Sequence, residues 1–169
     1  LLGPAKSAGC MAAISEPERM VRSGVFDGAM IQSDKIPDNY MILLDFGDGC
    51  IGEVYTGYCQ RATRMPLLEI YGTCGTISFV KAPGEVRPHL EVYTDHPGRG
   101  IRGWTEPMAL LEPKREFFDG KCLQDLIDAI ESDRPPVLSM ERQRHLVDIM
   151  CTIPACIKTG RTIPLSTTF

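Results

Sequence analysis

The chain has 169 residues, of which 43% are hydrophobic and 24% are charged, a balance that predicts one globular domain over residues 1–169. Its 18 Lys and Arg residues against 22 Asp and Glu give a net charge of −4 without a basic run, which argues against a nucleic-acid partner. No apolar stretch is long enough to span a membrane, and the N-terminus lacks the pattern of an export signal. We therefore expect a cytoplasmic protein that does not contact a membrane.

The cysteines are scattered along the chain and include no CxxC pair, which predicts reduced thiols in the core. No histidine stands at metal-ligand spacing from a cysteine, so we expect no metal site. A redox role for Cys151 and Cys156 stays open as the alternative to a structural one. The seven cysteines are Cys10, Cys50, Cys59, Cys74, Cys122, Cys151 and Cys156.

The first part of the chain is rich in strand patterns. Residues 5–15 are small and apolar enough for a buried strand, and the polar stretch 16–35 reads as a long irregular connection. Five segments with β-branched or aromatic residues between turn signals then predict strands at 40–46, 51–58, 67–71, 76–80 and 90–94. The connections between them are too short for crossover helices, so the pairing is predicted to be mainly antiparallel.

Alternation along residues 40–46 separates two faces of the predicted sheet. Ile42, Leu44 and Phe46 lie on one face, and Met41, Leu43 and Asp45 lie on the other. Because the second face is also mostly apolar, we expect it to be covered by another copy of the chain, in a homodimer or higher homo-oligomer. A further domain of the same protein that covers part of this surface is the alternative.

Helical patterns occupy the last third of the chain. Asp119 is a suitable N-cap for a helix that places Leu123, Leu126, Ile127 and Ile130 on one face and stops before Pro135. A second helix is predicted from Ser139 as N-cap to Gly160, with a kink or break at Pro154. Residues 95–118, around Trp104, read as a loop or irregular strand, and 162–165 as a short extended segment. This order predicts an α+β fold, an open, mainly antiparallel β-sheet with helices packed on one face.

The string Gly47-Asp48-Gly49-Cys50-Ile51-Gly52 matches the GxGxxG dinucleotide motif in letters only. That motif needs a helix after the glycines, whereas the residues that follow here favour a strand. Asp48-Gly49 is instead typical of a hairpin turn, with a positive φ at Gly49. No nucleophile elbow or paired catalytic carboxylates stand out, so we assign no catalytic and no cofactor-binding residue.

Four segments, taken in order, resemble the C-terminal domain of the glucose-fructose oxidoreductase/inositol dehydrogenase (Gfo/Idh/MocA) family. They are residues 38–49 (DNYMILLDFGDG), 68–77 (LEIYGTCGTI), 126–130 followed by Pro135-Pro136, and 159–165 (TGRTIPL). The resemblance implies an open antiparallel sheet with helices on one face and the other face used for subunit packing.

The same resemblance implies what the chain lacks. Family enzymes bind NAD or NADP in an N-terminal Rossmann domain, followed by a Glu-Lys-Pro segment with the catalytic lysine and a histidine motif, and none of these is present in residues 1–169. The chain therefore resembles the substrate and oligomerisation half of an NAD(P)-dependent oxidoreductase acting on a sugar, polyol or related hydroxy compound. We expect it to be inactive alone and to bind no cofactor without its Rossmann partner.

The resemblance also indicates where a small-molecule substrate would bind. The family segment that approaches the nicotinamide end of the cleft corresponds here to residues 59–64, in which Gln60, Arg61 and Arg64 offer hydrogen-bond donors. A solvated loop with two surface arginines is the alternative for these residues. For the whole chain, the alternative is a stand-alone, non-catalytic binding or assembly protein with the same fold.

Overall fold

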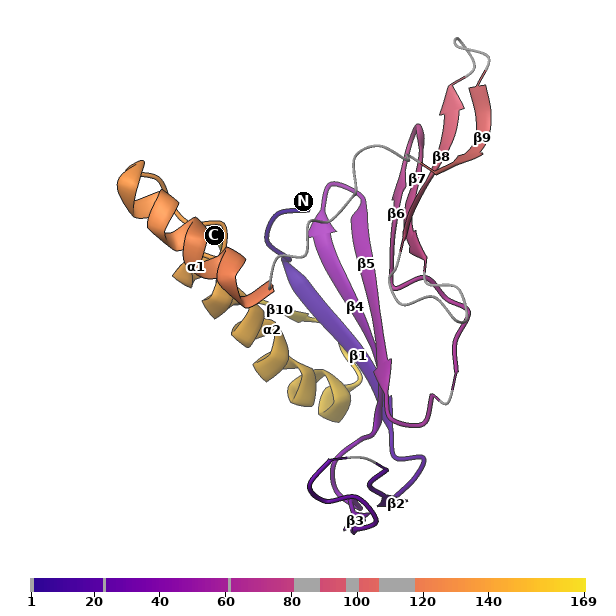
Figure 1. Cartoon of the computed structure of the whole chain (residues 1–169). Helices are drawn as coiled ribbons and strands as arrows, with labels where there is room; N and C mark the ends of the chain where they lie inside the picture. The colour runs from indigo at the N-terminus through magenta and orange to yellow at the C-terminus, as the bar shows by residue number, and fades with distance from the viewer. Residues whose placement is uncertain (1, 23, 61, 81–88, 97–100, 107–117) are drawn as a thin grey trace. The chain divides into compact units, whose positions relative to one another are not determined.

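The computed structural model describes residues 2–22, 24–60, 62–80, 89–96, 101–106 and 118–169. The chain divides into two compact units, one made of Leu1–Arg61 with Phe118–Phe169 and the other of Ala62–Phe117 (Figure 1). Every strand ladder in the described residues is antiparallel. The predicted α+β class and antiparallel pairing are therefore confirmed.

The first unit contains a four-stranded sheet in the order β10-β1-β4-β5. Its strands are β1 (Ser7–Ala13), β4 (Asn39–Gly47), β5 (Cys50–Gly57) and β10 (Ile163–Pro164). The stretch predicted to be irregular contains a small hairpin of β2 (Glu18–Met20) and β3 (Met30–Gln32). Strands of three residues are too short to show an alternating pattern, which is why the sequence did not indicate them.

The connection between β4 and β5 is the predicted hairpin turn. Asp48 has a φ of 54° and Gly49 a φ of 80°, the two positive values that a two-residue type I′ turn requires. Gly47 pairs with Cys50 across the turn, and the chain continues directly into β5. The GxGxxG string is therefore part of a hairpin, as predicted.

The two faces of this sheet differ as the alternation of β4 predicts. Ile42 is buried and Leu44 half-buried, whereas Met41 is 45% exposed and Leu43 is 57% exposed. Across the ladders Met41 lies opposite both Met11 and Tyr55, so these three side chains share the exposed face. Apolar residues of three neighbouring strands thus line one side of the sheet.

The other face carries α2 (Met140–Thr159), which lies against β1 and β10 (Figure 1). Its Cys156 is fully buried and its thiol donates to the carbonyl of Ala8, at 3.2 Å. Ser139 caps the start by accepting from the amide of Arg142, and Gly160 ends the helix with a φ of 64°. Both predicted caps are confirmed.

The helix is unbroken at Pro154, although the sequence predicts a kink or break there. An interior proline costs a regular helix about 3 kcal/mol because it removes a backbone hydrogen bond. His145 and Cys156, on either side of Pro154, are both buried and hydrogen-bond to the backbone of Ala5 and Ala8, so packing holds the helix in place before and after the proline.

Both ends of the first unit are attached to α2 through His145, which is 3% exposed. The amide of Ala5 donates to its Nε2 at 3.0 Å, so the ring hydrogen is on Nδ1, which lies 3.0 Å from the hydroxyl of Thr167. That hydroxyl donates in turn to Asp148, also on α2. One side chain therefore fixes the residues before β1 and those after β10.

The first helix, α1 (Phe118–Glu131), begins one residue before the predicted N-cap and ends before Pro135 as predicted. Its Ala129 is buried, but the apolar residues predicted to pack on the sheet are exposed, namely Leu123, Leu126, Ile127 and Ile130. In the described part of the chain, neither helix has the length and hydropathy that crossing a bilayer requires.

The second unit is a four-stranded sheet in the order β6-β7-β8-β9. Its strands are β6 (Leu68–Gly72), β7 (Gly75–Val80), β8 (His89–His96) and β9 (Ile101–Thr105). Trp104, in the stretch predicted to be a loop or irregular strand, lies on β9 and packs against Tyr93 with ring centroids 5.4 Å apart. Pairing with β8 makes Ile101–Thr105 a regular strand despite the turn-rich sequence around it. Residues 97–100 and 107–117 of the same stretch lie outside the described residues.

The cysteines are all free, but most are not in the core. Only Cys156 is buried, three others are half-buried, and Cys74, Cys122 and Cys151 are exposed. The prediction that all seven thiols lie in the core is therefore wrong for the exposed cysteines. Several apolar segments that were expected to be buried remain exposed.

The hairpin turn gives a matched pair of glycine substitutions. Gly49→Ala is expected to lower stability by about 1–2 kcal/mol because an L side chain is strained at a φ of 80°. Gly120→Ala, inside α1 with no atom within 4 Å of the added carbon, is expected to raise stability by up to about 1 kcal/mol. Urea denaturation of both variants measures the difference, and equal effects would contradict the turn.

Candidate functional site

The segment after β5 is the predicted substrate-contacting region. Gln60 is exposed and belongs to the first unit, whereas Arg64 is exposed and belongs to the second. Arg61 lies outside the described residues. The two described side chains are accessible to solvent, and their role in binding a substrate stays a prediction.

A buried carboxylate fixes the start of this segment. Asp38, just before β4, is 1% exposed and accepts hydrogen bonds from the amides of Ser15 and Glu16 at 2.9 and 2.8 Å. The thiol of Cys59 lies 3.5 Å from the same carboxylate, and the amide of Tyr58 donates to the Asp38 carbonyl at 2.9 Å. Asp38 thus joins the chain after β1 to the residues that lead into Gln60.

Arg19 of β2 completes this cluster. Its Nη1 lies 3.8 Å from the Asp38 carboxylate, and its guanidinium stacks over the ring of Tyr58, 4.7 Å from the centroid. The amide of Glu16, then that of Ser15, lowers the pKa of Asp38, against the effect of burial. The carboxyl is therefore held in its charged form, in which it can accept all of these hydrogen bonds.

Sequence reasoning missed Asp38 as an anchor. Its partners come from two other parts of the chain, residues 15–19 and 58–59, so only the fold brings them together. The one local indication is an acidic residue directly before an apolar strand, which is common at turns.

The GxGxxG string does not fit a dinucleotide. Nucleotide phosphates are held by amides at the N-terminus of a helix, whereas here residues Cys50–Gly57 form β5. No other glycine-rich turn in the described residues leads into a helix: Gly72 and Gly75 close the hairpin of β6 and β7.

The exposed face of the first sheet is the second candidate surface. Met11 is 79% exposed and Ile51 is 78% exposed, and both lie on the same face as Leu43. Exposed apolar residues that extend over three adjacent strands are typical of an interaction surface rather than of a solvated one.

No protein-family model and no curated protein matches the sequence. Solved structures do resemble the chain. An NAD binding oxidoreductase from Klebsiella pneumoniae has a TM-score of 0.72 at 18% identity, over 97% of this chain and 46% of its own. The apo form of a levoglucosan dehydrogenase has a TM-score of 0.70 at 19% identity, over 98% and 47%. An aldose-aldose oxidoreductase from Caulobacter crescentus, complexed with glycerol, has a TM-score of 0.64 at 15% identity, over 96% and 42%.

The chain has the fold of one part of these oxidoreductases. It spans about half of the length of each of them. The fold that the sequence resemblance implies is therefore confirmed, and nearly all of the chain takes part in the match.

Asp38→Asn is expected to lower the melting temperature at neutral pH, because the amide of Asn has one acceptor oxygen where the carboxylate of Asp has two. Since the pKa of Asp38 is lowered in the folded chain, its carboxylate stabilises the fold above the ordinary Asp pKa of about 3.9. That stabilisation is lost as the pH falls toward the lowered pKa, and the variant should lack this part of the acid dependence.

Thermal denaturation between neutral and acid pH measures both effects. Asp48→Asn is the matched control, because Asn is equally suited to a type I′ turn. If the Asp38 and Asp48 variants behaved alike, Asp38 would not be the anchor.

Proposed function

We propose that this chain is the substrate-binding and oligomerisation domain of an NAD(P)-dependent oxidoreductase of the Gfo/Idh/MocA family. The observation that carries the proposal is the fold match, which includes at least 96% of this chain and less than half of each oxidoreductase named above. The order of the four sequence segments that resemble the family supports the same assignment. The parent enzyme would act on a sugar, polyol or related hydroxy compound in the cytoplasm.

In this proposal Gln60, Arg61 and Arg64 donate hydrogen bonds to the substrate. The exposure of Gln60 and Arg64 and the anchoring of Tyr58 and Cys59 to Asp38 support it, because a binding side chain needs both access and a fixed backbone. An amide and guanidinium groups suit the hydroxyl or carboxylate oxygens of such compounds.

The Rossmann domain is the missing partner in this proposal. It would bind NAD or NADP and bring the catalytic lysine and histidine motifs, none of which occurs in the present sequence. The chain alone would therefore be catalytically incomplete.

Titration of the chain into NADH or NADPH tests this incompleteness. We expect no saturable change in nicotinamide fluorescence, because neither GxGxxG string of the sequence, 47–52 or 98–103, leads into a helix. The first continues into β5, and Ile101–Thr105 form β9. An intact sugar dehydrogenase is the positive control. Saturable binding at micromolar cofactor would show that the chain holds a cofactor site of its own.

The second role in the proposal is assembly of two copies through the exposed sheet face. The apolar residues of β1, β4 and β5 on that face support it, since α2 lies on the opposite side. A stable two-fold interface buries at least about 1,200 Å² in total, and a three-strand face is of the right order for each copy to provide half of that.

Leu43→Glu is expected to dissociate the proposed dimer, because it replaces an exposed apolar side chain of this face with a second carboxylate directly opposite Glu53. Sedimentation velocity over a hundredfold range of concentration measures the change. Val25→Glu is the control, as Val25 is exposed outside the strands of this sheet. A wild-type chain that stays monomeric throughout would contradict the dimer.

A further inference from the structure

A cluster of metal-ligand side chains lies where the β8 and β9 ladder ends. His89 and Glu91 are two residues apart on β8, so they point to the same side of the strand. The ladder pairs Val92 with Thr105, which places Glu91 opposite Glu106, the residue that follows β9. The strand register thus brings one imidazole and two carboxylates onto one face.

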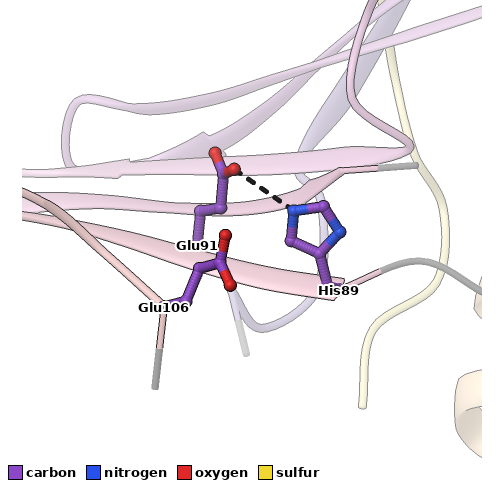
Figure 2. Close-up of side chains that lie close together, drawn as sticks. All are labelled: His89, Glu91 and Glu106. Carbon is purple, nitrogen blue, oxygen red and sulfur yellow. Dashed lines mark hydrogen bonds and ion pairs between the residues drawn. The ribbon is translucent and has the colours of Figure 1, made fainter. Parts of the chain in front are cut away.

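The side chains converge on one another in space (Figure 2). One ligand atom from each of the three residues lies within 4.8 Å of the others, and His89 Nε2 lies 3.2 Å from Glu91 Oε1. The His89 and Glu91 side chains are 32% and 31% exposed, and Glu106 is exposed. A solvated ion can therefore reach the cluster.

The spacing suits a bound cation. A zinc ion binds imidazole nitrogen and carboxylate oxygen at about 2.0–2.2 Å, so two of its ligands lie at most about 4.4 Å apart. The ligand atoms of the three residues, all within 4.8 Å of one another, lie close to that range. Two carboxylates that face each other across a ladder also repel, and a divalent cation between them removes that repulsion.

We propose that His89, Glu91 and Glu106 form a binding site for a divalent transition-metal cation of the zinc class. The imidazole favours such a cation over Mg²⁺ or Ca²⁺, which prefer oxygen ligands alone. Three protein ligands leave a coordination position for water, and a cation held by both strands ties the end of β9 to β8. In the hydrogen bond between His89 and Glu91, a proton lies between the two side chains, at the position that the cation would occupy.

Titration of the full chain with CoCl₂, followed by the visible absorption of bound Co²⁺, tests the site, with displacement by ZnCl₂ as confirmation. We expect saturable binding at one equivalent per chain. Glu106→Gln and His89→Gln should each weaken it at least about tenfold, the loss that follows even when a partner of a metal ligand is removed. Glu131→Gln, an exposed carboxylate at the end of α1, should leave it unchanged.

Circular dichroism of each variant shows that the fold is kept. Binding that persists unchanged in both the Glu106 and His89 variants, as binding at the exposed cysteines would, overturns the site. Absence of saturable binding in the wild-type chain reduces the cluster to an ion pair and overturns it as well. Displacement of Co²⁺ by MgCl₂ as effectively as by ZnCl₂ overturns the assignment to the zinc class.

Discussion

The docking of α2 on β1 determines what the first unit can present to a partner. His145 and Cys156 lie eleven residues apart, three turns of helix, and so share one face of α2. The first accepts from the amide of Ala5 and the second donates to the carbonyl of Ala8. Because these contacts fix α2 to one side of the sheet, the apolar residues of the opposite side are left without a helix to cover them.

This arrangement explains why so small a core coexists with so many exposed apolar residues. Among the described residues, the buried apolar ones are Ala5, Ala8, Ile42, Ala129 and Cys156. A chain of this size ordinarily buries about two thirds of its surface as a monomer. The exposed stripe of α1 and the exposed face of β1, β4 and β5 are instead apolar surfaces of the kind that interaction sites present.

The features that could be predicted from the sequence are those that depend on residues close to one another in the chain. Asp48-Gly49 fixes its turn by positive φ angles, and Ser139 and Gly160 fix the ends of α2. The features that were missed depend on contacts between distant residues. The Asp38 cluster needs three chain segments to meet, and the approach of Glu106 to Glu91 depends on the register of β8 and β9, which no local pattern encodes. The unbroken helix at Pro154 is likewise a result of packing.

The similarity to the oxidoreductases is a similarity of fold. A role for this chain in the chemistry of such enzymes is part of the proposed function. The proposed domain provides a sheet, a face for assembly and donors for a substrate, while the missing domain would provide the cofactor and the proton transfer. This division gives a physical reason why no catalytic set is found in the described residues. It also separates the proposal from a stand-alone binding or assembly protein, for which no catalytic domain would exist.

Sequencing the transcript upstream of the codon for Leu1 tests this division most directly. The proposal predicts an in-frame coding region with a strand, a GxGxxG motif that leads into a helix, and a Glu-Lys-Pro segment. An initiation codon immediately before Leu1, preceded by an in-frame stop, would contradict it and would favour the stand-alone protein.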